Sequence, residues 1–475
     1  MKKLQILLLF ALTLAACNTK KDNVTIKGKI INNKNGEMLY SSILDETCNG
    51  WFKDSVTPDS SGLFTITLKI DQPCFISLST NSSYKQIIIE PEETYEIEIG
   101  EEQIKLINQI SDAQLYYENL PASYPNGYGF FPVDVSGYDS IYDSLNNKLE
   151  NELLELRKVN CSEDVRNLIS ADRQVYYNFA ISSLASRKKM ASYRNNETTP
   201  IDVMKMWENA VPDTFLTDIA TKKSTYYFDL LGMAFWYNLY TKLDYDSLKV
   251  IRKEKREQGL IHTYNIELAK KLLPHEIIEY YTATYIQSKA KQTKFEKEFI
   301  ALFNQFKTDY PNSKYIEYIN PSIEKIVDFH DKIKVEFNEE YKFVDNYENI
   351  SSLKDCLIPF KGKKMYVDIW STSCGPCKKE FEFNEKLKET LKNKGVEMLY
   401  ISLDGDRTKS RWKDMIKYYS LKGNHIRANE KLIADLREKL GGFGIPRYLI
   451  INKQGDIVNS DAPRPSNLPE LEKQL

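Results

Sequence analysis

The sequence predicts a chain of three parts: an N-terminal antiparallel β domain, an α-helical middle region and a C-terminal α/β domain. Apolar residues alternate over residues 24–103, recur at helical spacing over 104–338, and fall into mixed strands and helices over 340–475. A chain of 475 residues is too long for one ordinary domain, and a hydrophobic content of 42% can fill several cores. The net charge of −2 gives no reason to expect nucleic acid as a partner.

A targeting segment is predicted at residues 1–17. A basic start precedes an apolar stretch that is too short to span a bilayer. Small residues then lead to a cysteine, in the order Leu14-Ala15-Ala16-Cys17, which resembles the lipobox of bacterial lipoproteins. The resemblance implies a lipoprotein signal peptide and a lipid on Cys17 that anchors the chain to a membrane. Ordinary secretory cleavage after Ala16, with Cys17 left as a free thiol, is the alternative.

Export of this kind places the chain in the cell envelope, facing the periplasm, where disulfides can persist. The chain has seven cysteines. Four of them lie outside both the lipobox and the pair described below, and their spacing fits no zinc pattern. They are Cys48, Cys74, Cys161 and Cys356. Cys48 and Cys74 can bridge within the β domain, or they can be small buried hydrophobic residues.

The β domain is predicted from three alternating runs, Val24–Ile30, Leu63–Ile70 and Tyr95–Ile99, with turn residues between them. Short strands with regular turns favour a small antiparallel sandwich or barrel. This part of the sequence carries no catalytic constellation. It resembles the β domain that precedes thioredoxin-like domains in lipoproteins of Bacteroidetes.

The middle region is predicted as helices because apolar residues recur at helical spacing, as at Ile141, Leu145 and Leu149. Ser162 can cap a further helix. No repeat of fixed period is present, although paired helices of a tetratricopeptide-like kind are compatible with the pattern. The aromatic run at residues 226–240 is interpreted as helix core, with a ligand face as the alternative.

The C-terminal domain is predicted as strand, helix, strand, helix, helix and hairpin, which fits a mixed sheet with helices on both faces. The predicted elements are a strand over 365–370, a helix over 378–394, a strand over 396–403, helices over 410–419 and 430–440, and a hairpin over 447–458. Two cysteines, Cys374 and Cys377, fall between the first strand and the first helix.

The spacing of Cys374 and Cys377 allows three interpretations: half a zinc site, a structural pair or a redox dithiol. Zinc needs two further ligands, which the neighbouring sequence does not supply, so no metal or other cofactor is expected. A helix N-terminus favours a thiolate at Cys374, because it presents free N–H groups and the positive end of the helix dipole. A strand before the pair, a helix after it and Gly-Pro between the cysteines favour the redox interpretation.

Two further residues sharpen this interpretation. Asp368 lies within the apolar strand before the cysteines, so its carboxyl should be poorly solvated and its pKa raised. Such a group can take up the proton of Cys377 when that thiol must become a nucleophile; an Asp368 at a solvated strand edge is the alternative. Pro446 opens a strand, where a cis peptide bond is possible. Trp370 is expected to pack under the site.

These residues carry a family resemblance. The run Met365 to Glu380, which contains Trp370-Ser371-Thr372-Ser373-Cys374-Gly375-Pro376-Cys377, and the run Gly444 to Gly455 resemble a TlpA/ResA-like member of the thioredoxin superfamily. The resemblance covers about residues 340–475. It implies a thioredoxin fold with an inserted segment around residues 408–440.

The resemblance also implies roles for single residues. Cys374 becomes the attacking cysteine, Cys377 the resolving cysteine and Asp368 the buried acid. Ile445-Pro446 becomes a cis peptide that faces the dithiol, where the backbone pairs with a bound substrate segment. We also count Trp370 among the substrate-binding residues.

Two residues depart from the family pattern. Ser373 stands where an aromatic residue commonly precedes the first cysteine, which makes the rim of the site more polar and leaves substrate preference open. Glu382 stands where the helix usually carries a kinking proline. Its absence predicts a helix without that kink.

We therefore expect an anchored thiol–disulfide oxidoreductase that reduces disulfides of envelope proteins, with a membrane thiol reductant upstream. A thiol peroxidase of the peroxiredoxin type is one alternative, although the Pro-x-x-x-Thr-x-x-Cys pattern of that family is missing here. The second alternative is a binding lipoprotein that carries a passive thioredoxin module. Residues 24–337 form about two-thirds of the chain, and no motif in them identifies a ligand.

Overall fold

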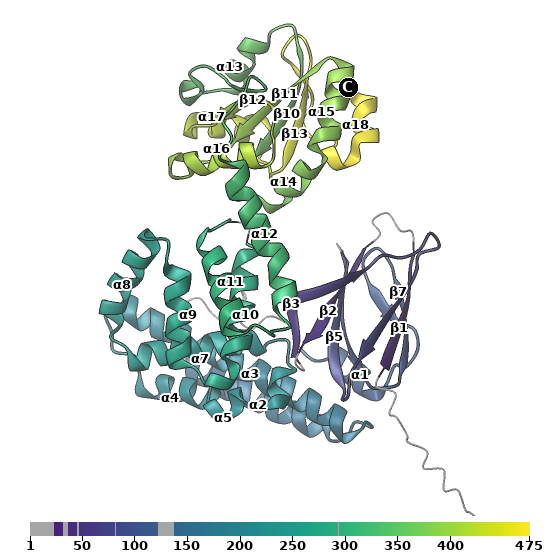
Figure 1. The fold of residues 1–475 in the computed structure, drawn as a ribbon, viewed down its shortest axis with the longest axis vertical. Helices are drawn as coiled ribbons and strands as arrows, with labels where there is room; N and C mark the ends of the chain where they lie inside the picture. Colours follow the sequence, from purple (N-terminus) through teal and green to yellow (C-terminus); the bar gives the residue numbers. More distant parts are fainter. Residues whose placement is uncertain (1–22, 32–36, 45–46, 81, 122–136, 293) are drawn as a thin grey trace, which may run out of the picture. The chain divides into compact units, whose positions relative to one another are not determined.

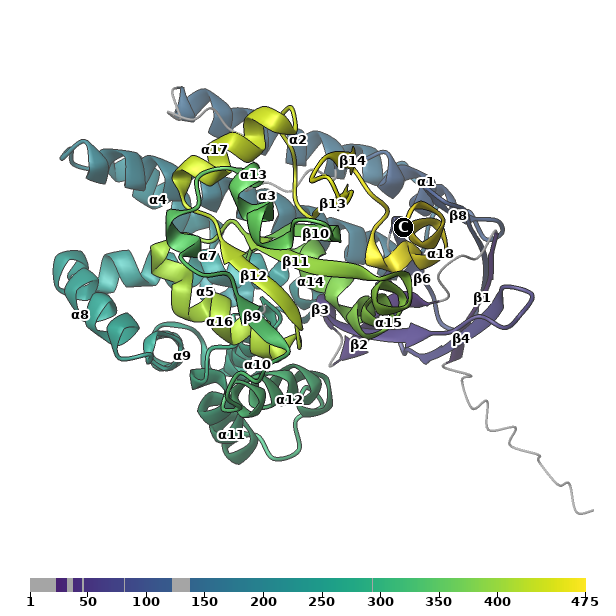
Figure 2. The same ribbon diagram turned by 90° about the horizontal axis from the view of Figure 1, so that it is seen from above.

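A computed structural model describes residues 23–31, 37–44, 47–80, 82–121, 137–292 and 294–475 (Figures 1 and 2). The chain divides into two compact units between Ile323 and Glu324. Cys17 and the rest of the predicted signal peptide lie outside the described residues, so the lipobox stays a prediction. The side chain of Cys48 is likewise not described, and its pairing with Cys74 stays open. No helix in the described ranges combines the length and the apolar character needed to cross a membrane.

The first unit begins with a β-sandwich of two four-stranded sheets, in the orders β4-β1-β7-β8 and β3-β2-β5-β6. Its strands are β1 Asn23–Ile30, β2 Met38–Leu44, β3 Thr47–Val56, β4 Leu63–Lys69, β5 Cys74–Ser79, β6 Tyr84–Ile89, β7 Thr94–Ile99 and β8 Ile104–Leu106. The alternating apolar residues of β1, β4 and β7 point into one shared core, as the sequence predicts. The sandwich is antiparallel except at one pair, since β1 runs parallel to β7.

The rest of the first unit is helical, as predicted. Its helices are α1 Asp112–Glu118, α2 Tyr138–Leu156, α3 Glu163–Arg194, α4 Ile201–Ala210, α5 Asp213–Leu216, α6 Ile219–Lys222, α7 Tyr227–Lys242, α8 Tyr245–Glu257, α9 Ile261–Leu272, η1 His275–Ile277, α10 Ile278–Ala290, α11 Glu298–Asp309 and α12 Ile316–Lys332, the last of which contains the boundary between the units. Ser162 caps α3, because its hydroxyl accepts a hydrogen bond from Val165 N–H at 3.3 Å. Buried residues recur along α7, which confirms helix core for this aromatic run.

The sandwich and the helices of the first unit share a core. Phe75 of β5 packs on Tyr117 of α1, with ring centroids 4.8 Å apart. Phe75 and Ile88 belong to the same buried cluster as Leu168 and Ile169 of α3. This shared burial explains why the β domain and the helices form one compact unit.

The second unit is a six-stranded mixed sheet in the order β14-β13-β10-β11-β12-β9. Its elements are β9 Tyr341–Phe343, η2 Tyr347–Asn349, α13 Leu353–Leu357, η3 Ile358–Phe360, β10 Lys364–Trp370, α14 Gly375–Glu380, η4 Phe381–Phe383, α15 Asn384–Lys394, β11 Val396–Ser402, η5 Asp406–Thr408, α16 Lys409–Tyr418, β12 Gly423–Arg427, α17 Glu430–Lys439, β13 Arg447–Ile451, β14 Ile457–Asn459, η6 Pro465–Asn467 and α18 Leu468–Gln474. Central strand β10 runs parallel to β11 and antiparallel to β13. This is the predicted thioredoxin fold.

The two faces of β10 differ in chemistry. Met365, Val367 and Ile369 belong to an aliphatic core that α13 and α17 cover. The alternate residues Tyr366, Asp368 and Trp370 therefore point to the opposite face. Figure 2 shows α13 and α17 on one side of the sheet and α14, α15 and α16 on the other.

Strand β12 is absent from the sequence prediction, which treats this stretch as part of an insertion. Its buried side chains are largely polar, so no apolar alternation marks it. Backbone carbonyl groups provide hydrogen-bond partners for these buried polar side chains. Asn424 Nδ2 donates to Met398 O at 2.9 Å, and His425 Nε2 lies 2.7 Å from Leu421 O. Short β9 then pairs with β12 and forms the edge of the sheet.

The predicted uninterrupted helix over 378–394 is wrong. A 3₁₀ turn at Phe381–Phe383 separates α14 from α15, although Glu382 occupies the place of the usual proline. Phe381 is buried within this turn and packs on Trp370 and Tyr419, each at a centroid distance of 5.2 Å. The helix is therefore interrupted without a proline, by a 3₁₀ turn in which the side chain of Phe381 is buried.

Candidate active site

The cysteine pair lies where β10 ends and α14 begins. Cys374 and Cys377 form a disulfide, with their Cα atoms 5.3 Å apart. Cys374 is the N-cap of α14, and its Sγ accepts a hydrogen bond from Cys377 N–H at 3.1 Å. Cys374 is 8% exposed and Cys377 is 0% exposed. Cys374 is therefore the more accessible of the two sulfur-bearing residues, and the roles of attacking and resolving cysteine stay a prediction.

The zinc interpretation of the pair gains no support from the structure. Within the ranges that the structure describes, no group of three or more His, Cys, Asp or Glu side chains is arranged to hold a metal ion. The bond between the two sulfur atoms instead fits a pair that cycles between dithiol and disulfide.

Asp368 lies in β10, six residues before Cys374, and is 1% exposed. Its Oδ1 accepts no hydrogen bond from any residue that the structure describes. Burial raises the pKa of this carboxyl well above its usual range, and the charge of Glu380 raises the pKa further. The predicted burial and raised pKa are both present, and the role of Asp368 in proton transfer stays a prediction.

Glu380 is a second buried acid, which the sequence analysis missed. It lies on α14 three residues after Cys377, and its carboxylate accepts hydrogen bonds from Ser466 N–H at 2.9 Å and from the Ser466 hydroxyl at 3.1 Å. Arg464 lies 4.0 Å away. The available signal was its position one turn after Cys377, on the same face of the helix.

Aromatic residues surround Asp368 on its sheet neighbours. Asp368 stands opposite Tyr400 of β11 and Tyr448 of β13 in the strand registers. The rings of Tyr366 and Tyr448 stack 5.4 Å apart at an interplanar angle of 7°. Burial raises the pKa of Tyr400 and of Tyr448, and the charge of Asp368 adds to both shifts. The surroundings of Asp368 are therefore dry and favour its protonated form.

Trp370 requires a correction. It has no exposed surface and packs edge-on against Phe381 at a centroid distance of 5.2 Å. It lies under the site, as the sequence analysis expects, but a fully buried ring cannot also contact a substrate. Its place among the substrate-binding residues is therefore wrong for this structure.

The Ile445–Pro446 peptide bond is cis, as predicted. Pro446 immediately precedes β13, in which Arg447 pairs with Ile369 of β10. This register brings Pro446 to the level of Trp370, where the loop to Cys374 begins. A mixed sheet of this order, a Cys-Gly-Pro-Cys pair at a helix N-terminus and a cis proline at the neighbouring strand define a thioredoxin-superfamily domain.

Comparison with known proteins agrees with this class. Residues 343–475 match the Redoxin family. The thiol-disulfide oxidoreductase ResA of Bacillus anthracis is 32% identical over 137 residues, which cover 27% of this chain and 72% of the relative. ResA of Bacillus thuringiensis subsp. konkukian is 34% identical over 99 residues, which cover 21% of this chain and 54% of the relative. The chain thus spans about half the length of the curated relatives that it matches first.

Solved structures that are similar to this chain cover about a quarter of it. A putative thiol-disulfide oxidoreductase from Bacteroides vulgatus is 30% identical, with 25% of this chain and 74% of that chain covered and a TM-score of 0.22. StoA from Bacillus subtilis is 21% identical, with 24% and 85% covered and a TM-score of 0.21. On the ResA match, the chain belongs to the TlpA/ResA-like thiol-disulfide oxidoreductases.

Proposed function

We propose that this chain is a thiol–disulfide oxidoreductase that reduces disulfides of envelope proteins. One observation carries the proposal: a reachable cysteine at a helix N-terminus is bonded to a fully buried cysteine one turn later. This asymmetry gives the two sulfur atoms different tasks. The outer one can meet a client, and the inner one can meet only the outer one.

The reaction needs two exchanges of a sulfur–sulfur bond. The Cys374 thiolate attacks a client disulfide, so that a mixed disulfide forms and one client sulfur leaves as a thiolate, which takes up a proton. The Cys377 thiol then loses its proton and attacks Cys374 Sγ, which releases the second client thiol. Two electrons pass from the dithiol to the client, and Cys374–Cys377 ends oxidised. A membrane-bound dithiol reductant is the proposed source of electrons for the next cycle.

The ionised form of Asp368 is the proposed acceptor of the Cys377 proton. A carboxyl exchanges protons with a thiol more readily when its pKa rises toward that of the thiol. Burial and the neighbouring charge of Glu380 supply this shift for Asp368. The carboxyl then returns the proton when the dithiol is reduced again.

The substrate side of the site is assigned to Ile445 and Pro446. Ile445 is partly exposed, and the register of β13 brings this corner to the end of β10. We propose that the backbone of Ile445 pairs with an extended client segment while Cys374 holds its sulfur. An extended segment adds to such an edge through main-chain hydrogen bonds.

The proposed location is the cell envelope, with the chain held to a membrane by a lipid on Cys17 and facing the periplasm. The lipobox and the short apolar stretch before it support this location. Incorporation of labelled palmitate into the wild-type chain, and its loss in Cys17→Ser, would test it. An unlabelled, soluble wild-type protein in the producing cell would reject the anchor.

Insulin reduction tests the activity. We expect the full chain to reduce insulin disulfides with dithiothreitol as electron donor, and Cys374→Ser to be inactive. Cys161→Ser is the matched control, because Cys161 is a partly exposed cysteine of the first unit. Equal activity of wild type and Cys374→Ser would reject the proposal.

A further inference from the structure

Asp404 lies at the end of β11, beside the loop that leads from β10 to Cys374. Its carboxylate accepts hydrogen bonds from Thr372 N–H at 2.8 Å and from the Thr372 hydroxyl at 2.6 Å. The Ser402 hydroxyl donates a third hydrogen bond, at 2.6 Å. Asp404 is 6% exposed and Thr372 is buried. A carboxylate with three such donors in a buried site holds its partners firmly, because hydrogen bonds to an ionised acceptor are about twice as strong as neutral ones.

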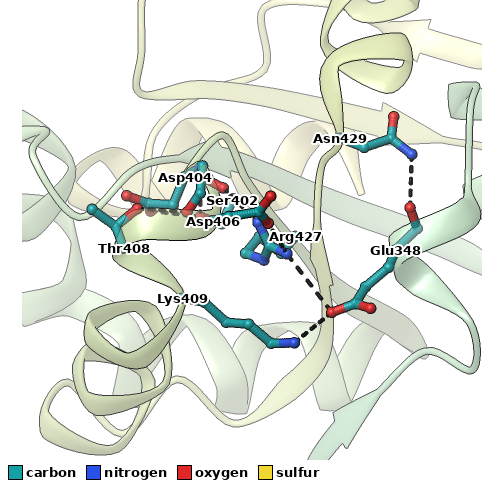
Figure 3. Close-up of polar contacts among 9 residues, drawn as sticks. Glu348, Ser402, Asp404, Asp406, Thr408, Lys409, Arg427 and Asn429 are labelled. Atoms are coloured by element: carbon teal, nitrogen blue, oxygen red, sulfur yellow. Dashed lines mark hydrogen bonds and ion pairs between the residues drawn. The ribbon is translucent and has the colours of Figure 1, made fainter.

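Arg427 of β12 fixes the backbone that carries Asp404, as Figure 3 shows. Its guanidinium donates to Asp404 O at 3.3 Å and pairs with the Asp406 carboxylate at 2.8 Å. Glu348 lies 3.7 Å from the same guanidinium and pairs with Lys409 at 2.6 Å. Through Arg427, the polar strand β12 therefore holds the loop after β11 in place.

Thr372 connects this network to the dithiol. It stands two residues before Cys374, in a turn in which Cys374 N–H donates to Ser371 O at 3.1 Å. Leu403 N–H also donates to Trp370 O at 2.8 Å, which fixes the start of the same turn. The position of Cys374 as N-cap of α14 thus depends on a loop that is held at Trp370 and Thr372.

The charge of Asp404 also reaches the start of α14. Lys378 follows Cys377, and burial and Arg411 lower the pKa of its ammonium to about 8, while Asp404 opposes the shift. An anion that acts on Lys378, the residue after Cys377, is also expected to disfavour a thiolate at the start of α14. Asp404 can therefore act on the dithiol in two ways, through the geometry of Thr372 and through its charge.

We propose that Asp404, through Thr372, is the positioning residue of the dithiol loop and sets the balance between the dithiol and the disulfide. The inference rests on the proposed function only in taking Cys374 and Cys377 as a redox pair. Its test is the equilibrium of that pair with glutathione, measured in the full chain. This equilibrium can be measured whether or not the protein reduces any client.

Four variants separate geometry, charge and simple destabilisation. Thr372→Val removes the hydroxyl donor without a change in charge, and Thr372→Ser restores it. Asp404→Asn keeps the shape, removes the charge and replaces one acceptor oxygen by an NH2 donor, whereas Thr372→Val changes the hydrogen bonding alone. Asp345→Asn is the control, since Asp345 is an exposed acid of the second unit that lies outside the contacts of Asp404 and Arg427 described above.

We expect Asp404→Asn to shift the equilibrium about tenfold toward the dithiol, which is ~30 mV for a two-electron couple. The midpoint of the pH profile of Cys374 alkylation should move to lower pH, because a neutral group replaces the anion. Thr372→Val should shift the equilibrium at least threefold in either direction. Thr372→Ser and Asp345→Asn should match the wild type in both readouts.

A purely structural role gives a different pattern. It lowers the thermal stability of the oxidised and reduced proteins equally and leaves the glutathione equilibrium unchanged, because the two stability changes cancel in that equilibrium. If Thr372→Val and Asp404→Asn both show this pattern, the inference is overturned. If Asp404→Asn does not fold, Thr372→Val against Thr372→Ser decides alone. Wild-type insulin reduction is scored separately, so a failure of the proposed activity cannot be mistaken for a failure here.

Discussion

The buried acid Asp368 gives the sharpest prediction about stability and turnover. Because its folded-state pKa lies above the ordinary value of 3.8, the unfolded chain ionises first as pH rises. The carboxyl therefore costs folding free energy above pH 3.8, and the cost grows by about 1.4 kcal/mol per pH unit until the folded state ionises as well. Asp368→Asn removes this penalty. We expect the stability of Asp368→Asn relative to the wild type to rise by about 1.4 kcal/mol between pH 4.5 and pH 5.5.

The same variant should be slow in catalysis, because it lacks the acceptor for the Cys377 proton. Loss of a general base typically costs at least about 100-fold. We expect the release of client from the mixed disulfide to slow by about that factor at pH 7, while the attack by Cys374 changes far less. Urea unfolding at each pH and stopped-flow release of a labelled client peptide measure the two effects. Glu382→Gln, the same chemical change at an exposed position, is the control.

Asp368→Asn could also refute this reasoning. A stability difference that stays flat across this pH range would mean that Asp368 is ionised in the folded protein. Resolution at the wild-type rate would mean that another group takes the proton of Cys377.

Two further predictions concern the same face of the sheet. Glu380→Gln removes a charge that raises the pKa of Asp368, so the pH profile of the resolution step should move to lower pH, and an unshifted profile would contradict the coupling. Burial lowers the pKa of His425 from 6.5 to about 4, so the contribution of His425 to stability should be complete above pH 6.5 and fall by about 1.4 kcal/mol per pH unit as pH drops toward 4. His425→Gln should remove that part of the acid loss in thermal unfolding, and an identical slope in both proteins would exclude it.

The dithiol, the cis proline and the fold of the second unit could be predicted because their signals are local. Cys374 and Cys377 lie between a strand and a helix, and the apolar run around Asp368 already indicates its burial. Pro446 stands at the start of a strand, where proline is tolerated, and the family resemblance implies its cis bond. The inferences about the cysteines and Asp368 need only a few neighbouring residues.

Glu380, Asp404 and β12 could not be predicted in the same way, because their partners are distant in sequence. The inferred role of Asp404 depends on its hydrogen bond with Thr372, which lies on the preceding strand–helix connection. Arg427 is a buried charge that makes sense only beside Asp404 and Asp406. Polar residues of this kind resemble solvent-exposed ones in a hydropathy pattern, and only the tertiary hydrogen bonds identify them.

A weak signal for Asp404 was nevertheless present. β10 and β11 run parallel, so their carboxyl ends meet at the same edge of the sheet. An acid directly after the second strand is therefore expected to lie near the cysteines that follow the first.

The central claim is that Cys374 attacks the client and Cys377 resolves the mixed disulfide. Intact-mass spectrometry of the reduced full-length variants with a disulfide-containing peptide tests it most directly. We predict that Cys377→Ser accumulates one peptide adduct, located at Cys374, and that Cys374→Ser forms none on Cys377, which is buried. An adduct on Cys377 in Cys374→Ser, with none on Cys374 in Cys377→Ser, would reverse the roles and contradict the account.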